Sequence, residues 1–307
     1  MKSREIDSQA AIAFDRLTVR YGKKLALDNI SIMVPPGTVY ALIGRNGAGK
    51  SSTVRCLLGQ QKPNAGHASI FGKNSWRERT AAMLRVGVVP EEPNAPPEMT
   101  APQIASFCAS LYNKWNMKSV LARFERFGVP LNVPFGRLSK GQKGQVALAL
   151  ALGCEPALLI LDDPTLGLDV VARKELFEEL VGELADLGMS VFITTHDLAG
   201  VERIADRVGI LKEGKLVIND ELEILKSRFR RICYPNYDSE KQPQYHGELD
   251  KMNTVQVKVR GWGVEAVVAD YDDSNSMHFR CNGINPEIST MSLEEIFTAV
   301  VGETKGE

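Results

Sequence analysis

Apolar and polar residues alternate along residues 12–20 and 30–34, as they do in half-buried β-strands. The sequence PPG at residues 35–37 then indicates a turn. Residues 39–43 (VYALI) are apolar throughout, which is typical of a central parallel strand covered on both faces. A Gly-rich loop and a helical pattern over about residues 50–58 follow this strand. The N-terminal part therefore predicts an α/β core.

Residues 87–90 predict another strand, and a proline-rich loop separates it from a long helical pattern over about residues 101–153. Apolar residues recur along that pattern at Phe107, Leu111, Val120, Leu121, Phe124 and Phe127. We therefore expect a helical subdomain inserted into the core. The core pattern then resumes with a strand at 157–161, a helix at 172–187, a strand at 190–194, and a closing hairpin at 208–211 and 216–218.

The pattern changes after about residue 222, where a polar and aromatic stretch without a clear period indicates a linker. Further strand candidates are Val255 to Val259, residues 264–271 and residues 278–281. SLEE at 292–295 has the spacing of a helix capping box. The expected organisation is a large domain at 10–222 with its helical subdomain at about 95–153, a linker at 223–250, and a small α+β domain at 251–307.

Composition narrows the class of protein. The formal net charge of −1 leaves no basic surplus, so we expect no nucleic-acid partner. The five cysteines are scattered without a C-x-x-C spacing, which favours a reduced, cytoplasmic setting over a zinc or disulfide framework. The polar first ten residues indicate no secretory signal, and the most apolar stretch, residues 146–161, is interrupted at Glu155 and Pro156. Any role at a membrane is therefore expected to require a partner.

Residues 44–51 read GRNGAGKS and match the Walker A pattern G-x-x-x-x-G-K-[ST]. Gly44, Gly47 and Gly49 let the backbone turn tightly and direct N–H groups at phosphate oxygens. Lys50 would neutralise the β- and γ-phosphates of ATP, and the Ser51 hydroxyl would coordinate Mg²⁺. The alternative, a glycine-rich turn with an accidental lysine, fits the preceding strand and following helix poorly.

Asp162 ends the apolar run LLIL, where a carboxylate can hold Mg²⁺ through water. An aspartate at a strand end is also a common turn or cap former. With a Walker A loop in the same chain, the metal-binding interpretation is favoured.

LSKGQ at residues 138–142 lies between these two motifs. In this order the chain resembles the ATP-binding subunits of ABC transporters, whose signature loop is usually LSGGQ. YNKWN at 112–116, ALALALG before the second motif, and SLEEIF at 292–297 resemble the bacterial branch that pairs with ABC-2 type exporters. The resemblance implies a P-loop NTPase core, α/β in class, with a mainly parallel sheet, an antiparallel β-subdomain and an inserted helical subdomain.

The resemblance also implies site residues. The nucleotide would contact Tyr21, Gly44, Arg45, Asn46, Gly47, Ala48, Gly49, Lys50, Ser51, Ser52, Ser139, Gly141 and Gln142. The metal would be held by Ser51, Asp162 and Glu91, and hydrolysis would use Asp163, His196 and Lys50. Tyr21 would stack on adenine, the signature residues would face a nucleotide bound on another subunit, and LGLD at 166–169 would be the D-loop.

Two residues depart from the family pattern. Asp163 stands where the family has a glutamate base, and Glu91 where it has a glutamine. Aspartate is shorter by about 1.5 Å, and a misplacement of about 1 Å costs on the order of a hundredfold in rate. The chain is thus expected to be an ATPase, slow if this shorter reach is not compensated. The alternative is an ATP-gated dimerisation switch with little hydrolysis.

The family implies two partners, an integral membrane transporter subunit and a second ATP-binding cassette, in a homodimer or a heterodimer. The protein would then lie on the cytoplasmic face of the cell membrane and drive transport, with export favoured. A relative acting on DNA or ribosomes ranks last, because the chain has neither a coiled-coil insertion nor a second cassette.

Overall fold

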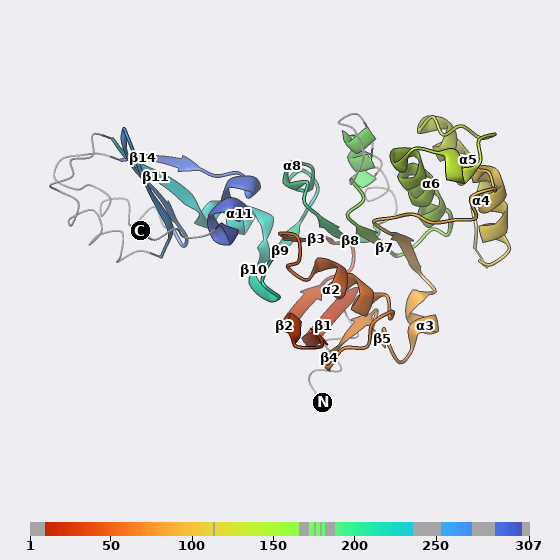
Figure 1. The fold of residues 1–307 in the computed structure, drawn as a ribbon, viewed down its shortest axis with the longest axis horizontal. Helices are drawn as coiled ribbons and strands as arrows, with labels where there is room; N and C mark the ends of the chain where they lie inside the picture. Colours follow the sequence, from red (N-terminus) through yellow and green to blue (C-terminus); the bar gives the residue numbers. More distant parts are fainter. Residues whose placement is uncertain are drawn as a thin grey trace. The chain divides into compact units, whose positions relative to one another are not determined.

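The computed structural model describes residues 10–302 apart from 113, 166–171, 175, 179, 182–187, 236–252 and 272–285. The chain divides into two compact units, Met1–Asn219 and Asp220–Glu307. Figure 1 shows the fold and labels many of the elements of both units.

A six-stranded sheet forms the centre of the first unit, in the order β10-β9-β3-β8-β7-β6. Its strands are β6 (Val86–Val89), β7 (Leu158–Asp162), β3 (Val39–Gly44), β8 (Ser190–Thr195), β9 (Arg207–Lys212) and β10 (Lys215–Glu221). Neighbouring strands pair in parallel along the run β9-β3-β8-β7-β6. Every residue of β3 and β8 is buried, as the apolar runs predict for strands covered on both faces. The α/β class with a mainly parallel sheet is confirmed.

A second, antiparallel sheet in the same unit has the order β2-β1-β4-β5. Its strands are β1 (Ile12–Tyr21), β2 (Lys24–Val34), β4 (Ala65–Ile70) and β5 (Lys73–Asn74). Between β3 and β4 the chain forms α2 (Lys50–Leu57), and α3 (Arg79–Met83) follows β5. β4 has the sequence AGHASI, which lacks alternation, and only its pairing with β1 makes it a strand.

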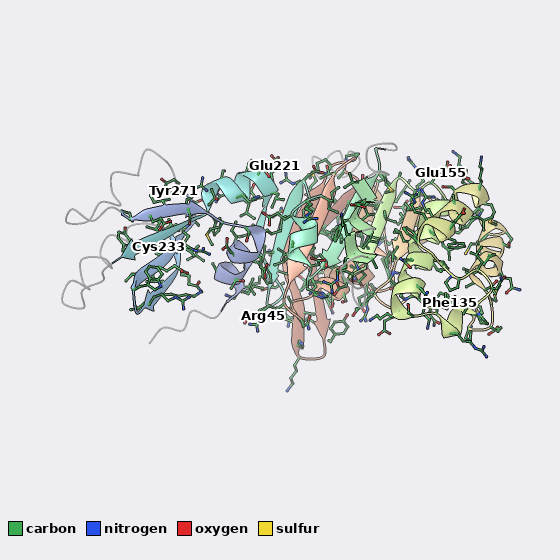
Figure 2. The ribbon with its side chains drawn as sticks, turned by 90° about the horizontal axis from the view of Figure 1, so that it is seen from above. Arg45, Phe135, Glu155, Glu221, Cys233 and Tyr271 are labelled. Atoms are coloured by element: carbon green, nitrogen blue, oxygen red, sulfur yellow. The ribbon has the colours of Figure 1, made fainter. Side chains whose placement is uncertain are left out.

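The inserted helical part contains α4 (Ala101–Ala109), α5 (Met117–Arg126), the short η1 (Phe135–Arg137) and α6 (Lys140–Gly153). Val120 and Phe124 are buried between the helices, whereas Phe107 and Leu111 are exposed. Figure 2 labels Phe135, in η1 ahead of α6, and Glu155, just after the end of α6. Capping boxes begin α4 at Thr100 with Gln103, and α6 at Ser139 with Gln142.

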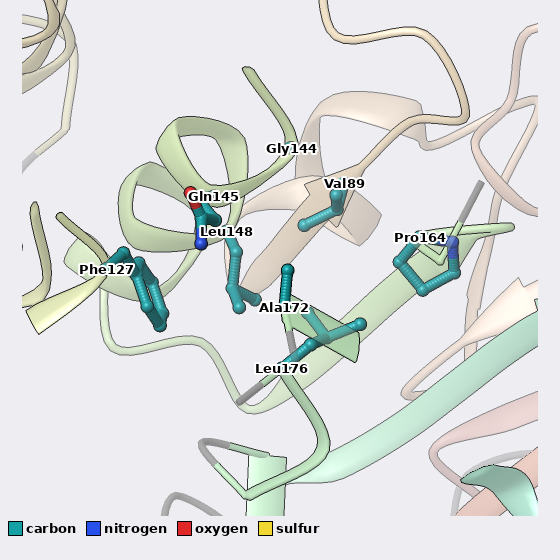
Figure 3. A pocket seen from close by; sticks show the side chains of 8 residues that line it. All are labelled: Val89, Phe127, Gly144, Gln145, Leu148, Pro164, Ala172 and Leu176. Carbon is teal, nitrogen blue, oxygen red and sulfur yellow. The ribbon is translucent and has the colours of Figure 1, made fainter. Parts of the chain in front are cut away.

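An apolar crevice separates this helical part from the core (Figure 3). Leu148 of α6 and Phe127 line one side, and Pro164 and Leu176 line the other. The described residues of 172–181 are helical, in agreement with the predicted helix, while 182–187 lie outside the described residues. The short helix α8 (Leu198–Val201) follows β8.

The described residues of the second unit form a four-stranded antiparallel sheet, in the order β12-β13-β11-β14, and two helices. Its elements are α9 (Leu222–Arg228), β11 (Arg230–Pro235), β12 (Thr254–Arg260), β13 (Gly263–Val268), β14 (Glu287–Thr290) and α11 (Leu293–Val301). α11 begins with the expected capping box of Ser292 and Glu295. Figure 2 labels Cys233 on β11.

The structure corrects the expected linker at 223–250. Its first part is α9 and β11, and β11 pairs with both β13 and β14. Ile232 and Tyr234 alternate with Arg231 and Cys233 and are buried in a small core cluster. The flanking arginines and prolines conceal this alternation in the sequence. Residues 236–250, and the strand expected at 278–281, lie outside the described residues.

Across the described residues, no helix has the length and apolar content needed to cross a membrane.

Phe192 on β8 is fully buried and stacks on Tyr40 of β3, with ring centroids 5.8 Å apart. Phe192→Ala is expected to lower the free energy of unfolding by about 3–5 kcal/mol, because truncation leaves a cavity under the central sheet. Urea denaturation followed by circular dichroism measures the loss. Phe107→Ala, at a side chain 56% exposed, is the control and should change stability by less than about 0.5 kcal/mol. Equal losses would contradict this account of the core.

Candidate nucleotide-binding site

The Gly-rich loop connects β3 to α2, as the Walker A motif predicts. Gly49, which precedes α2, has φ +116°, and a Cβ there would lie 2.6 Å from Leu27 Cδ2 and 2.7 Å from the Ala26 oxygen. Gly47 has φ +81°. These conformations favour glycine, so the loop keeps its shape only with these residues.

The Lys50 ammonium folds back onto its own loop. Its Nζ donates to the Gly44 oxygen at 2.7 Å and to the Arg45 oxygen at 3.4 Å. Burial lowers the pKa of Lys50, and the carboxylates of Asp163, Asp162 and Glu91 act in the opposite direction. The partly buried cation therefore lies in a field of three carboxylates, held by backbone carbonyls.

An open pocket of about 360 Å³ lies over this loop. Its lining residues are Tyr21, Lys24, Ala26, Asn46, Gly47, Gly49, Lys50, Ser51, Ser52, Glu91, Asp162 and Asp163. The structure thus brings ten of the predicted site residues together and adds Lys24 and Ala26. Tyr21 is 42% exposed, and its hydroxyl lies 3.4 Å from Ser52 Oγ.

Three predicted loop residues shape the pocket from outside its lining. Gly44 supplies the carbonyl that accepts from Lys50. The Arg45 oxygen accepts from the Ala48 N–H at 3.0 Å, and the Ala48 oxygen accepts from the Gly214 N–H at 3.0 Å. Figure 2 labels Arg45.

Two consecutive acids end β7 and face the pocket. Asp162 Oδ1 accepts from Thr194 Oγ1 at 2.6 Å. Burial raises the pKa of Asp162, while the Thr194 hydrogen bond acts to lower it. Asp163 has φ +48°, and its N–H donates to the Thr194 oxygen at 2.8 Å.

The Asp163 carboxylate is engaged on both oxygens. Oδ2 lies 2.9 Å from His196 Nδ1, and Oδ1 lies 3.5 Å from Thr195 Oγ1. The His196 side chain is about half exposed, at 51%, and does not line the pocket. The structure therefore pairs two of the three residues expected to serve hydrolysis.

The donor chemistry of the pocket fits magnesium. Ser51, Asp162 and Glu91 offer a hydroxyl and two carboxylates, the hard oxygen ligands this ion prefers. Within the described residues no group of three or more His, Cys, Asp and Glu side chains could hold a metal ion. Magnesium is usually bound by one or two carboxylates together with substrate phosphates.

The signature residues do not line this pocket. Ser139 is the N-cap of α6, and its Oγ accepts from the Gln142 N–H at 3.2 Å. The Gln142 side chain accepts from the Ser139 N–H at 3.0 Å, so it completes the cap. Gly141 lies in the first turn of the same helix. The D-loop at 166–169 lies outside the described residues.

Sequence reasoning missed Thr194 and Thr195, which contact the acid pair. The available signal was two threonines directly after a wholly apolar strand, where a hydroxyl is buried at the same sheet edge as the acids.

The fold and the pocket define a P-loop nucleotide-binding protein. The model of a family described as "ABC transporter" matches residues 27–166. The bacitracin transport ATP-binding protein BcrA of Bacillus licheniformis is 35% identical over 218 residues, covering 70% of this chain and 71% of that protein. The Nod factor export ATP-binding protein I of Paraburkholderia xenovorans is 36% identical over 214 residues, covering 68% and 70%.

Solved structures agree. An ATP-binding subunit of an ABC transporter superposes with a TM-score of 0.64 at 28% identity, covering 71% of this chain and 92% of that chain. A dimeric bacterial ABC transporter cassette, at 24% identity and a TM-score of 0.63, shares the fold. The chain belongs to the ABC transporter ATPase family, as an ATP-binding subunit.

Asp162→Asn is expected to raise the Tm of the nucleotide-free, magnesium-free protein at pH 7, on the order of 3 °C. The raised pKa of Asp162 means that the folded state disfavours its ionised form, and the amide removes that cost. The gain should be full above the raised folded-state pKa of Asp162, shrink as the pH falls through that pKa, and be lost below the unfolded value of 3.8, where both states are protonated. Differential scanning fluorimetry across pH measures it.

Asp270→Asn is the control of opposite sign. Hydrogen bonds from Asn253 and Arg228 lower the pKa of Asp270, so its ionised form stabilises the fold and the amide should lower the Tm at pH 7. A lower Tm for Asp162→Asn as well would refute the electrostatic account of the acid pair.

Proposed function

We propose that this chain works as one half of a pair of cassettes that close around two molecules of MgATP. The main support for this proposal is the lining of the pocket. The Walker A loop, Asp162 and Asp163 line it, whereas Ser139 and Gly141 lie at the start of α6 and do not. A second cassette would place its signature residues at this pocket, and the signature residues of this chain would lie at the pocket of the second cassette. That second cassette is an identical copy or a homologous chain.

Each predicted residue has a task in this site. The loop N–H groups of residues 44–52 and the Lys50 ammonium bind phosphates, and Tyr21 stacks on the adenine. Ser51, Asp162 and Glu91 would hold magnesium, which would neutralise phosphate charge. Glu91 adds a negative charge that a glutamine would not, so the site depends more strongly on magnesium.

Hydrolysis breaks the bond between the γ-phosphorus and the bridging oxygen, and a water oxygen forms the new bond to phosphorus. The Asp163 carboxylate orients this water or takes its proton. His196, paired with Asp163 at 2.9 Å, contacts the γ-phosphate. Lys50 stabilises the charge on the phosphoryl oxygens. ADP and phosphate then leave and the pair reopens.

We assign the work of this cycle to export, driven through an integral membrane subunit. The support is similarity to ATP-binding proteins named for bacitracin transport and Nod factor export. The membrane subunit would seat in a largely apolar cavity of about 270 Å³ between the helical part and the loop after β6, with Tyr112, Trp115 and Phe135 in its lining. The protein would then lie on the cytoplasmic face of the membrane.

The second candidate is an ATP-gated switch that closes on nucleotide with little hydrolysis. The observation that favours it is the 2.9 Å contact of His196 Nδ1 with Asp163 Oδ2, which engages a carboxylate already shorter in reach than the family's glutamate.

Steady-state ATP hydrolysis with magnesium separates the two candidates. Wild type is expected to turn over, and Asp163→Asn should lose at least about 100-fold in kcat because the water loses its proton acceptor. Binding of a fluorescent ATP analogue should stay within about twofold, which serves as the control for folding. Asp163→Glu should retain activity.

A silent wild type together with an active Asp163→Glu variant would contradict the motor and establish the switch. Silence of both, with ATP bound, would place turnover under the control of the membrane subunit.

Ser139→Ala in the Asp163→Asn background tests the paired cassette. The parent is expected to dimerise on ATP, and loss of the Ser139 hydroxyl should weaken that dimer about tenfold, as measured by analytical ultracentrifugation. Thr100→Ala is the matched control, because Thr100 caps α4 through the same type of capping box. Both changes should cost about 1 kcal/mol of stability. Equal weakening of the dimer by both would contradict the role of the signature loop.

A further inference from the structure

Two neighbouring threonines, Thr194 and Thr195, end β8 beside the acid pair. Both are fully buried at 0% exposure. In the parallel pairing of β7 and β8, Asp162 is the partner of Thr194. Each threonine hydroxyl contacts the carboxylate of a different acid, Thr194 that of Asp162 and Thr195 that of Asp163.

The hydrogen of the Thr194 hydroxyl has a defined direction. Oγ1 lies 3.3 Å from the Asp163 backbone nitrogen, which can only donate. The hydroxyl therefore accepts there and donates its single hydrogen to Asp162 Oδ1 at 2.6 Å. Such a bond fixes the rotation of the carboxylate and favours its ionised form.

The direction of the Thr195 hydroxyl hydrogen follows from its contacts in the same way, with more partners involved. Its Oγ1 accepts from the Asp197 N–H at 3.0 Å and lies 3.3 Å from Thr165 Oγ1. The assignment that satisfies every contact has Thr165 donating to Thr195, and Thr195 donating to Asp163 Oδ1 at 3.5 Å. With both lone pairs occupied, the hydroxyl hydrogen is directed at the carboxylate.

We infer that Thr194 and Thr195 are positioning residues with separate tasks in ATP hydrolysis. Thr194 orients Asp162 toward magnesium and the nucleotide, and Thr195 orients Asp163 toward the attacking water. The inference rests on the proposed function, since it presumes that these acids have those roles.

The contact from Thr195 matters more because Asp163 is shorter than a glutamate. Asp163 reaches less far than a glutamate, so a small rotation removes its carboxylate from the water, and misplacement by about 1 Å costs on the order of a hundredfold. The left-handed backbone of Asp163, at φ +48°, is held by its bond to the Thr194 oxygen. The hydroxyl of Thr195 then restrains the side chain itself.

The test replaces each threonine by valine, which keeps the shape and removes the hydroxyl, and by serine, which keeps the hydroxyl. Two quantities are measured for each variant: the magnesium concentration needed for binding of a fluorescent ATP analogue, and kcat with KM for ATP hydrolysis. Ser190→Ala is the matched control, because Ser190 is a buried hydroxyl on the same strand that accepts from the Gly37 N–H at 2.9 Å, away from the acids.

Thr194→Val is expected to raise the magnesium requirement for analogue binding by about 10- to 100-fold. Thr195→Val should lower kcat by about 10- to 100-fold while analogue binding and its magnesium dependence stay within about twofold. The serine variants should restore most of each loss. Ser190→Ala should lower the Tm and change neither quantity.

The inference is overturned if the two valine variants shift the same quantity, if either shifts none, if serine fails to restore function, or if Ser190→Ala reproduces the effects. A wild type that binds the analogue with magnesium and does not hydrolyse ATP would refute the proposed turnover, and with it the task of Thr195. The Thr194 arm is still decided by binding in that case, so the two failures are distinguishable.

Discussion

The parallel pairing of β3, β8 and β7 is the constraint on which the site depends. Ile43 at the end of β3 pairs with Thr195, and Thr194 pairs with Asp162. This register brings the Gly-rich loop, the threonines and the acids to one edge of the sheet, as ligand sites in parallel sheets require. Slipping one strand by a residue would reverse its side chains and separate the hydroxyls from the carboxylates.

The site carries an electrostatic cost when no nucleotide is bound. Burial disfavours the charged forms of Lys50 and Asp162. Nearby carboxylates partly offset this cost for Lys50, and the Thr194 hydroxyl and the cations of Arg55 and Lys50 partly offset it for Asp162. A triphosphate with magnesium supplies the missing opposite charges. The left-handed backbone of Asp163 is part of the same arrangement, since stability is given up where binding requires a fixed geometry.

The helical part connects the nucleotide pocket with the surfaces proposed for the second cassette and the membrane subunit. α6 begins at Ser139 with the signature residues and continues to Leu148, which lines the apolar crevice opposite Pro164, the residue after Asp163. The same helix contributes Val146 and Leu150 to the larger apolar cavity beside the loop after β6. One helix thus has contacts toward a second cassette, toward the acids and toward the proposed membrane subunit.

The sequence by itself determined the elements whose pattern is local. The apolar runs at 39–43 and 158–161, the Walker A loop and the capping box at Ser292 predicted their structures, because each depends on residues close in the chain. Tertiary structure decided the rest. β4 and β11 are strands because they pair with β1 and β13. Since β11 lies within residues 223–250, the linker expected there was wrong over its first part. The contacts of Thr194 and Thr195 join residues more than thirty positions from the acids, and only the register of the folded sheet makes them neighbours.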